Sequence, residues 1–364
     1  MTGSSTPGTG TPGHHLVLLG TSTAHLRFLA GLNQHPLVGV TVSLVTTHTR
    51  HVHAQQLADI VAGQATLEQG SVALQPLLLH SGVRWLTQPV VALDPANRSL
   101  RLHDGSVLHY DWLSLAQTQA QERAAVEAAL PGARAHGLFV HPLEVFCELW
   151  PRVVALGASR KLRVAVVGAD QTALELALAM PASLPGAAIT LITANQPLAA
   201  EVPPAVRQRL LALLRARNIT LLQDAAAELR ADEIQLGSGA RLACDVPVLA
   251  GLAQTPVWLA HSGLMPDEQS RIEVDAQLRA VSHPSVFVLS DSDQPSTRAT
   301  QTLAANLRAV ADGTPLQSLG AVRGRLHFAT TGARHAVAGW GNWAAQGRWV
   351  WGWKRKLQRT PSMA

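Results

Sequence analysis

The sequence predicts an α/β protein with two open parallel sheets and a small C-terminal module. Two stretches, 15–46 and 161–193, carry the same order of a buried strand, a glycine turn, a helix and a second strand. Continuous apolar and β-branched runs, like those that open both stretches, are typical of strands that helices cover on both faces. The repeat is one of architecture, since the two stretches differ in sequence.

The second stretch is the clearer of the two. Lys161–Met180 reads KLRVAVVGADQTALELALAM, which predicts a strand over Leu162–Val167, a turn at Gly168 and a helix from about Thr172. The next strand is predicted at Ala188–Thr193. In nucleotide-binding units of this kind the N-terminus of the helix meets a pyrophosphate, because its free amides and its dipole attract negative charge.

The glycine pattern of this turn is incomplete. A dinucleotide-binding turn follows G-x-G-x-x-G/A, and here Gly168 and Ala173 match while Asp170 takes the middle place. A carboxylate at that place adds bulk and negative charge beside the phosphates. The sequence therefore leaves open that this unit binds no nucleotide tightly.

The first stretch has lost more of the pattern. A strand is predicted over His15–Leu19, a helix over His25–Leu32 and a second strand over Val38–Thr46. The turn reads GTSTAH and keeps only its first glycine, Gly20. Ser22 takes the middle place, where its small side chain obstructs a phosphate less than an aspartate would.

The remaining elements follow from local patterns. An antiparallel meander is predicted where alternating runs flank the turn signal Asp104-Gly105, and a hairpin where Gly237–Gly239 forms the tip. Further helices and one more buried strand are predicted from periodicity, at Gln121–Ala129, Leu143–Val154, Pro204–Arg217 and Thr300–Ala311 for the helices and at Ser285–Leu289 for the strand.

Composition bounds the class of protein. The chain has 364 residues, enough for two or three domains, and with 47% hydrophobic and 15% charged residues it is globular. The net charge of +5 is spread along the chain until the C-terminus, which argues against a nucleic-acid-binding body. Residues 1–14 are predicted to be a flexible leader. No apolar run has the length of a membrane span, so we expect a cytoplasmic protein, either soluble or peripheral on the inner face of the membrane.

Cysteine and histidine usage disfavours a metal centre. Cys147 and Cys244 are far apart and form no C-x-x-C, so a redox-active disulfide and a cysteine zinc site are both disfavoured, and a reducing compartment is expected. His48, His51 and His53 lack the spacing and the neighbouring carboxylate of a metal site, so no metal is predicted.

The C-terminal tail differs from the rest of the chain. Five of the nine tryptophans gather there among arginines and lysines, at Trp340, Trp343, Trp349, Trp351 and Trp353. Tryptophan with cations is the composition of a segment at a bilayer interface. Two alternatives stay open, namely aromatics packed under the main domains and a subunit interface in a homodimer. The alternation of the last three tryptophans suits a strand with one aromatic face.

Taken together, these pieces resemble the two-dinucleotide flavoproteins of the pyridine-nucleotide oxidoreductase superfamily. The most specific ones read HLVLLGTSTAHLRFL, RVAVVGADQTALELALAM, SHPSVFVLSD and the tryptophan-rich tail. The similarity points to the type II NADH dehydrogenase-like branch, in particular to the flavoprotein associated with selenophosphate synthetase. It implies a discontinuous FAD-binding-type domain at 15–150 and 246–320, an inserted NAD(P)H-binding-type domain at 151–245 and a C-terminal module at 321–364.

The resemblance also implies which residues hold the cofactors. For FAD these are Gly20, Ser22 and Ala24 in the first turn, Gly251 from a motif that packs on the flavin domain, and Asp291, which keeps the aspartate of a late G-D pair. For NAD(P)H they are Gly168, Asp170, Ala173 and the helix acid Glu175. The second strand of the inserted domain ends in Thr193-Ala194-Asn195, without the acid that favours NAD or an arginine that favours NADP, so that choice stays open.

Two functions follow. The first is an FAD-dependent NAD(P)H oxidoreductase, in which nicotinamide passes a hydride to flavin and electrons then reach a quinone or another acceptor. No catalytic acid or base stands out. The second is a degenerate, non-catalytic relative that keeps the fold as a binding or scaffold protein. If each lost glycine weakened binding by about 1.4 kcal/mol, the affinity would fall roughly ten-fold per site.

Overall fold

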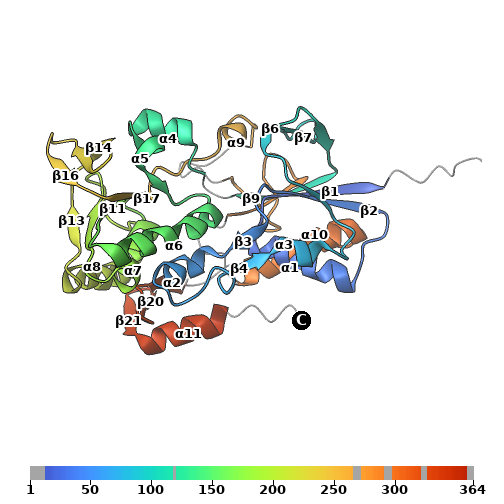
Figure 1. Cartoon of the computed structure of the whole chain (residues 1–364). Helices are drawn as coiled ribbons and strands as arrows, with labels where there is room; N and C mark the ends of the chain where they lie inside the picture. Colours follow the sequence, from blue (N-terminus) through green and yellow to red (C-terminus); the bar gives the residue numbers. More distant parts are fainter. Residues whose placement is uncertain (1–12, 118–119, 265–271, 291–296, 321–325, 359–364) are drawn as a thin grey trace, which may run out of the picture. The chain divides into compact units, whose positions relative to one another are not determined.

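The computed structural model describes residues 13–117, 120–264, 272–290, 297–320 and 326–358. The chain divides into two compact units (Figure 1). The first unit consists of 1–49, 73–118 and 255–320, and the second of 50–72, 119–254 and 321–364. Each unit contains one of the two repeated stretches. The cofactor-domain boundaries given above stay a prediction, since compactness alone does not define a cofactor domain.

A five-stranded parallel sheet forms the centre of the first unit. Its order is β18 (Val286–Ser290), β9 (Trp112–Gln117), β1 (His14–Leu19), β2 (Val40–Val45) and β5 (Arg84–Leu86). Leu16, Val17 and Leu18 of β1 are fully buried, as expected of a strand covered on both faces. The helices are α1 (Thr23–Gln34), α3 (Leu74–Leu78), α9 (Val257–Ala260) and α10 (Thr297–Asp312), and α1 packs against α10. An antiparallel meander of β6 (Val90–Asp94), β7 (Ser99–Leu102) and β8 (Val107–His109) confirms the predicted one.

A second five-stranded parallel sheet forms the centre of the second unit. Its order is β10 (Leu138–Phe139), β17 (Val246–Leu249), β11 (Arg163–Val167), β12 (Ala188–Ile192) and β13 (Thr220–Leu222). The other elements are η1 (Ala54–Gln56), α2 (Leu57–Val61), α4 (Arg123–Ala129), α5 (Ala133–His136), α6 (Leu143–Ser159), α7 (Gln171–Ser183), α8 (Pro204–Ala216), a β-pair of β3 (Arg50–Val52) and β4 (Ser71–Ala73), and a small antiparallel sheet of β14 (Ala226–Leu229), β15 (Glu233–Leu236) and β16 (Arg241–Ala243).

Helix α7, which carries the predicted site residues Ala173 and Glu175, is largely buried. Leu174 and Leu178 lie on one face of the helix and Leu176 on the opposite face, and none of the three has exposed surface. Neighbours surround α7, since it contacts β11 and β12 of the sheet, the helices α2 and α8, and the C-terminal strand β19 (His327–Thr330). Neighbours on several sides explain why leucines on opposite faces of the helix are both buried.

The C-terminal segment packs onto the second unit. Strands β19, β20 (Ala336–Trp340) and β21 (Trp343–Gly347) form an antiparallel sheet, and helix α11 (Arg348–Gln358) follows (Figure 1). The strand suggested by the alternating tryptophans is therefore wrong for Trp349–Trp353. Strand β21 ends at Gly347, whose positive φ of +141° turns the backbone. The buried residues beyond it, Val350 and Lys354, lie four apart, which is the spacing of one helix face.

No helix within the described ranges is long and apolar enough to cross a bilayer.

Candidate functional site

The first glycine turn joins β1 to α1. Gly20 has φ +76°, a conformation that favours glycine, and a Cβ there would come within 3.4 Å of the Ala116 Cβ. Ser22 is the N-cap of α1 and its hydroxyl accepts a hydrogen bond from the His25 amide at 3.2 Å. The serine in the middle place of the pattern thus caps the helix, and serine is one of the residues preferred at the N-cap.

The turn also contains His25, which was not among the residues predicted from the sequence. It takes the last place of the glycine pattern and is fully buried. One ring nitrogen contacts the Gly20 carbonyl oxygen at 2.9 Å, and the other contacts the Ser114 hydroxyl of β9 at 2.7 Å. Burial lowers the pKa of His25 to about 4, so the imidazole is neutral at physiological pH. The sequence did carry a signal for His25, because it stands where the pattern G-x-G-x-x-G has its third glycine.

The first turn fits an anionic group. In the part of the chain that the structure describes, the amides of Thr23 and Ala24 have no acceptor, and both lie in the first turn of α1. Free amides and the helix dipole make this end attractive to a pyrophosphate. The predicted residues Gly20, Ser22 and Ala24 thus lie together. Asp291, the remaining predicted FAD residue of this unit, lies outside the described residues.

The second glycine turn brings three predicted residues together. Gly168 has φ +154°, and a Cβ there would lie 2.7 Å from the Gly251 amide nitrogen and 3.0 Å from the Ala173 Cβ. Gly251 donates its amide to the Val167 carbonyl at 2.8 Å. The side-chain amide of Gln121 donates to the Leu249 carbonyl at 2.8 Å and fixes the end of β17 that leads into Gly251. Only small residues permit this contact between the two backbones.

Two carboxylates cover the start of α7. Asp170 is the N-cap, and its Oδ1 accepts from the Ala173 amide at 2.8 Å. Glu201, from the connection between β12 and α8, accepts from the Gln171 amide at 2.6 Å. Burial, together with the nearby charge of Glu201, raises the pKa of Asp170 to about 6. Acidic oxygens therefore already accept from two amides of the second turn, and a bound pyrophosphate would have to displace at least one of them.

The comparisons with known proteins decide the family. A family model described as "Pyridine nucleotide-disulphide oxidoreductase" matches residues 14–306. The chain belongs to this family. The predicted superfamily and the α/β class with two dinucleotide-binding-type sheets are thereby confirmed, and the chain is an oxidoreductase of the NAD(P)/FAD-dependent type. FAD and a pyridine nucleotide are the cofactors that the family implies.

Solved structures of the same fold agree with this assignment. The sulfide:quinone oxidoreductase of Aquifex aeolicus is 15% identical, covers 94% of this chain and 89% of its own, and has a TM-score of 0.70. For NDH2 of Plasmodium falciparum, solved with NADH, the identity is 12%, both coverages are 94% and the TM-score is 0.66. The water-forming NADH oxidase of Lactobacillus brevis is 16% identical over 90% of this chain and 75% of its own, with a TM-score of 0.67. Identities this low show a shared fold, which includes the predicted NADH dehydrogenase-like fold. No curated sequence matches the chain.

Within the family's expected nucleotide site, Glu175 faces the C-terminal segment. Its carboxylate accepts a hydrogen bond from the Gln171 side chain, whose amide nitrogen also donates to the Phe328 carbonyl at 2.9 Å. Burial raises the pKa of Glu175 to about 7, and the charge of Lys354 opposes this rise. Its predicted role toward NAD(P)H stays a prediction.

Glu175, Asp59 and Lys354 form what we call the buried charge cluster. Lys354 of α11 is 2% exposed, and its Nζ donates to the Gln55 carbonyl at 2.7 Å and to the Thr330 hydroxyl. The same Nζ lies 3.9 Å from Asp59 Oδ2. The indole of Trp351 donates to Asp59 Oδ1 at 2.8 Å. Helix α11 is therefore attached to the second unit through charged groups.

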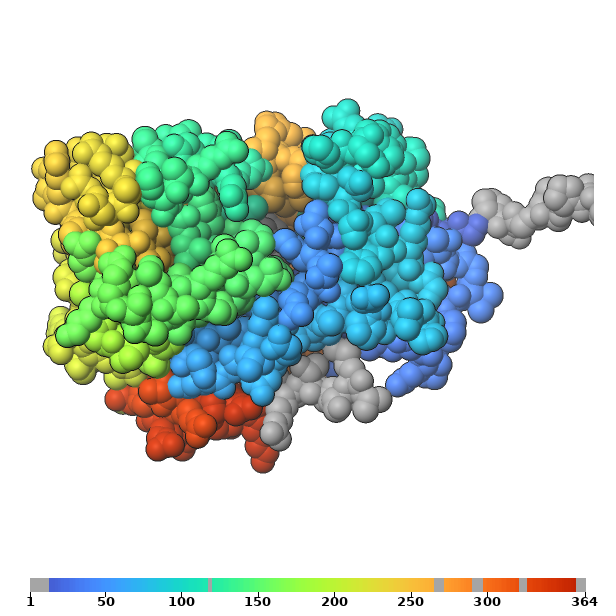
Figure 2. All heavy atoms as spheres, viewed as in Figure 1, coloured from blue at the N-terminus to red at the C-terminus, as the bar shows by residue number. Residues whose placement is uncertain are grey.

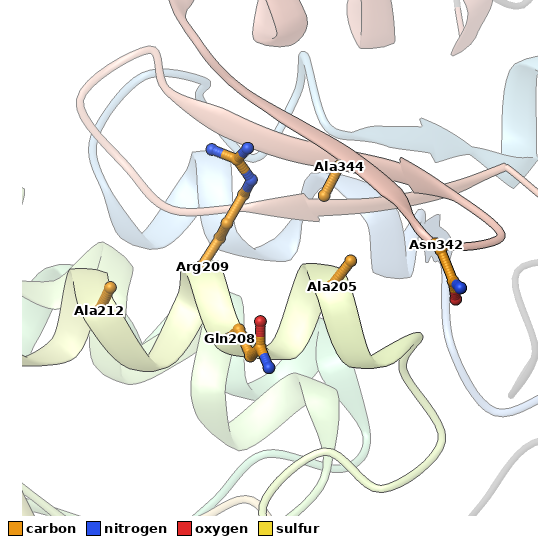
Figure 3. Close-up of a pocket in the computed structure, with 6 residues that line it drawn as sticks. All are labelled: Ala205, Gln208, Arg209, Ala212, Asn342 and Ala344. Carbon is orange, nitrogen blue, oxygen red and sulfur yellow. The ribbon is translucent and has the colours of Figure 1, made fainter.

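The surface pocket, the two cysteines and the possible metal ligands of the described chain add no catalytic group to the candidate site. A surface pocket between α8 and the β20–β21 hairpin is lined by Ala205, Gln208, Arg209, Ala212, Asn342 and Ala344 (Figure 3). Its one charged side chain, that of Arg209, has no acidic or nucleophilic companion there. Cys147 and Cys244 are buried, and burial raises their pKa values to about 12 and about 11, so neither is a reactive thiolate at neutral pH. Within the described ranges, no group of residues could hold a metal ion.

Proposed function

We propose that the chain is a flavin-dependent oxidoreductase that draws electrons from NAD(P)H and delivers them to a quinone or another small-molecule acceptor. The first turn carries this proposal, because Gly20 permits a tight turn and, among the residues that the structure describes, nothing accepts from the amides of Thr23 and Ala24, which can therefore receive a phosphate. Bound FAD would supply the hydride and electron transfer, while the protein supplies binding and orientation. The link to selenophosphate synthetase stays a prediction from resemblance.

The residues of the first turn would share the work of holding FAD. Gly20 leaves space for the pyrophosphate, and the start of α1 supplies partial positive charge. His25 fixes the turn to β9 through Ser114 and, being neutral, adds no charge of its own. Asp291 is proposed for the ribityl side of the flavin. No residue is proposed as a catalytic acid or base.

Replacing Gly20 by valine is expected to weaken FAD uptake by at least ten-fold, because a β-branched residue is strained at positive φ and its side chain would press on Ala116, so the turn would have to move. Visible absorption of the purified protein, titrated with FAD and then with NADH, measures this. Gly31→Ala is the matched control, since Gly31 lies within α1 and a Cβ there meets no atom within 4 Å. Equal uptake by wild type and Gly20→Val would contradict the assignment of the turn.

The alternative is the non-catalytic binding or scaffold protein. The carboxylates of Asp170 and Glu201 at the second turn favour it, because they stand where a nucleotide's phosphates would bind. A folded wild-type protein that retains no flavin, takes up no FAD saturably and shows no loss of flavin absorption with NADH would support this alternative. It would contradict the proposed enzymatic function.

We propose that α11 binds peripherally to the surface of an anionic bilayer. Trp349, Trp353 and Leu357 follow one another at four-residue spacing and are 60%, 36% and 53% exposed. We call these three residues the tryptophan face. Exposed Arg348, Arg355 and Lys356 accompany it, with no acid in the helix. Figure 2 displays the C-terminal segment, in red, at the surface of its unit. Interfacial tryptophan with cations suits anionic headgroups.

The double variant Trp349→Ser with Trp353→Ser is expected to bind anionic vesicles at least ten-fold more weakly than wild type, because it removes most of the apolar surface of the tryptophan face. Vesicle co-sedimentation at low and high salt measures this, and wild-type binding should fall with salt. Leu79→Ser, at a position 69% exposed in the first unit, is the control. Unchanged binding by the double variant, or a change from dimer to monomer instead, would favour the alternatives of internal packing or a homodimer interface.

A further inference from the structure

We infer that Glu201 competes with the pyrophosphate of a nucleotide for the start of α7 and so keeps the second turn closed. The inference rests on the proposed function, because it concerns the nucleotide site of that same oxidoreductase. It makes Glu201 a determinant of nucleotide affinity, although Glu201 belongs to no glycine motif.

The two helix starts differ in what their amides contact. At α1 the serine cap takes one amide, that of His25, and the amides of Thr23 and Ala24 remain without an acceptor in the described chain. At α7 the Ala173 amide goes to Asp170 and the Gln171 amide goes to Glu201, at 2.8 Å and 2.6 Å. The second helix start therefore already has charged acceptors, and a phosphate oxygen would have to replace at least one of them.

The segment that supplies Glu201 is packed down over the turn. We call residues 198–202 the closing segment. Ala199 donates its amide to the Ala169 carbonyl at 2.6 Å, directly within the glycine turn, and the Val202 amide returns to the Ala199 carbonyl at 3.1 Å. Leu198, Ala199 and Val202 are buried. The Glu201 carboxylate is thus held at the turn by a segment with its own apolar anchors.

Charge adds to this steric competition. Asp170 and Glu201 approach the same helix start, and the charge of Glu201 makes the ionised form of Asp170 less favourable. A pyrophosphate that entered beside these two carboxylates would bring further negative charge to the same helix start, and like charges repel. Removal of the Glu201 carboxylate frees one amide and removes one like charge. Both changes act in the direction of tighter nucleotide binding.

The test is a titration of Glu201→Ala and wild type with NADH, followed by nucleotide fluorescence in the absence of an acceptor. We expect Glu201→Ala to bind NADH at least ten-fold more tightly. Glu148→Ala is the matched control, because Glu148 is exposed on α6 of the same unit and its removal changes the net charge equally. NADPH is titrated in parallel, since the end of β12 favours neither nucleotide.

Hydrogen exchange gives a second readout that needs no nucleotide. The Gln171 amide should exchange faster in Glu201→Ala than in wild type, because it loses its acceptor, while the Ala173 amide keeps its protection from Asp170. Unchanged NADH affinity in Glu201→Ala would overturn the inference. If that variant still takes up flavin, the proposed function stands and only the role of Glu201 is lost. If neither flavin nor NADH binds to either protein, both fail.

Discussion

Replacing Lys354 by methionine is expected to lower the free energy of unfolding of the second unit by about 3–5 kcal/mol. The substitution keeps the length of the side chain but leaves the buried Asp59 carboxylate and the partly buried Glu175 carboxylate without their cation, and removal of one partner from a buried ion pair costs about this much. It also removes the donor to the Gln55 carbonyl and to the Thr330 hydroxyl. Urea unfolding followed by tryptophan fluorescence measures the loss.

Lys356→Met is the matched control, since Lys356 lies on the same helix but is exposed, and its loss should change the unfolding free energy by less than about 0.5 kcal/mol. The double variant Lys354→Met with Asp59→Asn should recover part of the loss, because it removes one of the uncompensated charges. Equal effects of Lys354→Met and Lys356→Met would show that the buried charge cluster does not hold α11.

The buried charge cluster shows where prediction from the sequence ends. Asp59, Glu175 and Lys354 stand on three helices that are far apart in the chain, and no local pattern links them. Glu175 could be named only through the family resemblance, which places an acidic residue on that helix. Lys354 was one cation among several in the tail, and its burial depends on the packing of α11 against α2 and β19. Contacts of this kind follow from tertiary structure, which periodicity does not encode.

Local signals did predict the repeated architecture. The run Leu162–Val167, the turn at Gly168 and the helix that follows appear as β11, the turn and α7, because a β-branched run and a helix-period stripe each determine one element. The prediction of a strand in the tail was wrong because the local pattern there fits two kinds of element. Alternation at Trp349, Trp351 and Trp353 fits a strand, but the spacing of four between Trp349 and Trp353 also fits a helix, and the burial of Val350 and Lys354 decided for the helix.

At the two glycine turns, too, some residues could be predicted from the local pattern and others could not. Asp170 was flagged as an obstacle from its place in the glycine pattern, and the structure adds that it caps α7. His25 stood in the same pattern and could have been flagged by the same rule. Glu201 could not, because its contact with the Gln171 amide arises only when the connection after β12 folds back over the turn.

The stability of the second unit is expected to fall as the pH rises from about 5 to 8, and Glu175 should cause much of this fall. Its pKa is raised from 4.5 to about 7 in the folded protein, so the folded state holds the proton more tightly than the unfolded state. The stabilisation is complete below about pH 4.5 and is lost as the pH passes through 7. A shift of this size corresponds to roughly 3 kcal/mol.

The variant Glu175→Gln tests this directly, because glutamine keeps the shape and the hydrogen bonding of the protonated acid but does not titrate. Thermal unfolding at a series of pH values should show a flatter pH dependence in Glu175→Gln than in wild type, with the larger gain in melting temperature at pH 8. Part of the slope should remain, since burial also raises the pKa of Asp170, to about 6. Glu148→Gln, at an exposed position, should keep the full wild-type slope. Parallel curves for wild type and Glu175→Gln would mean that Glu175 is already ionised at pH 5 and that Lys354, rather than a proton, balances its charge.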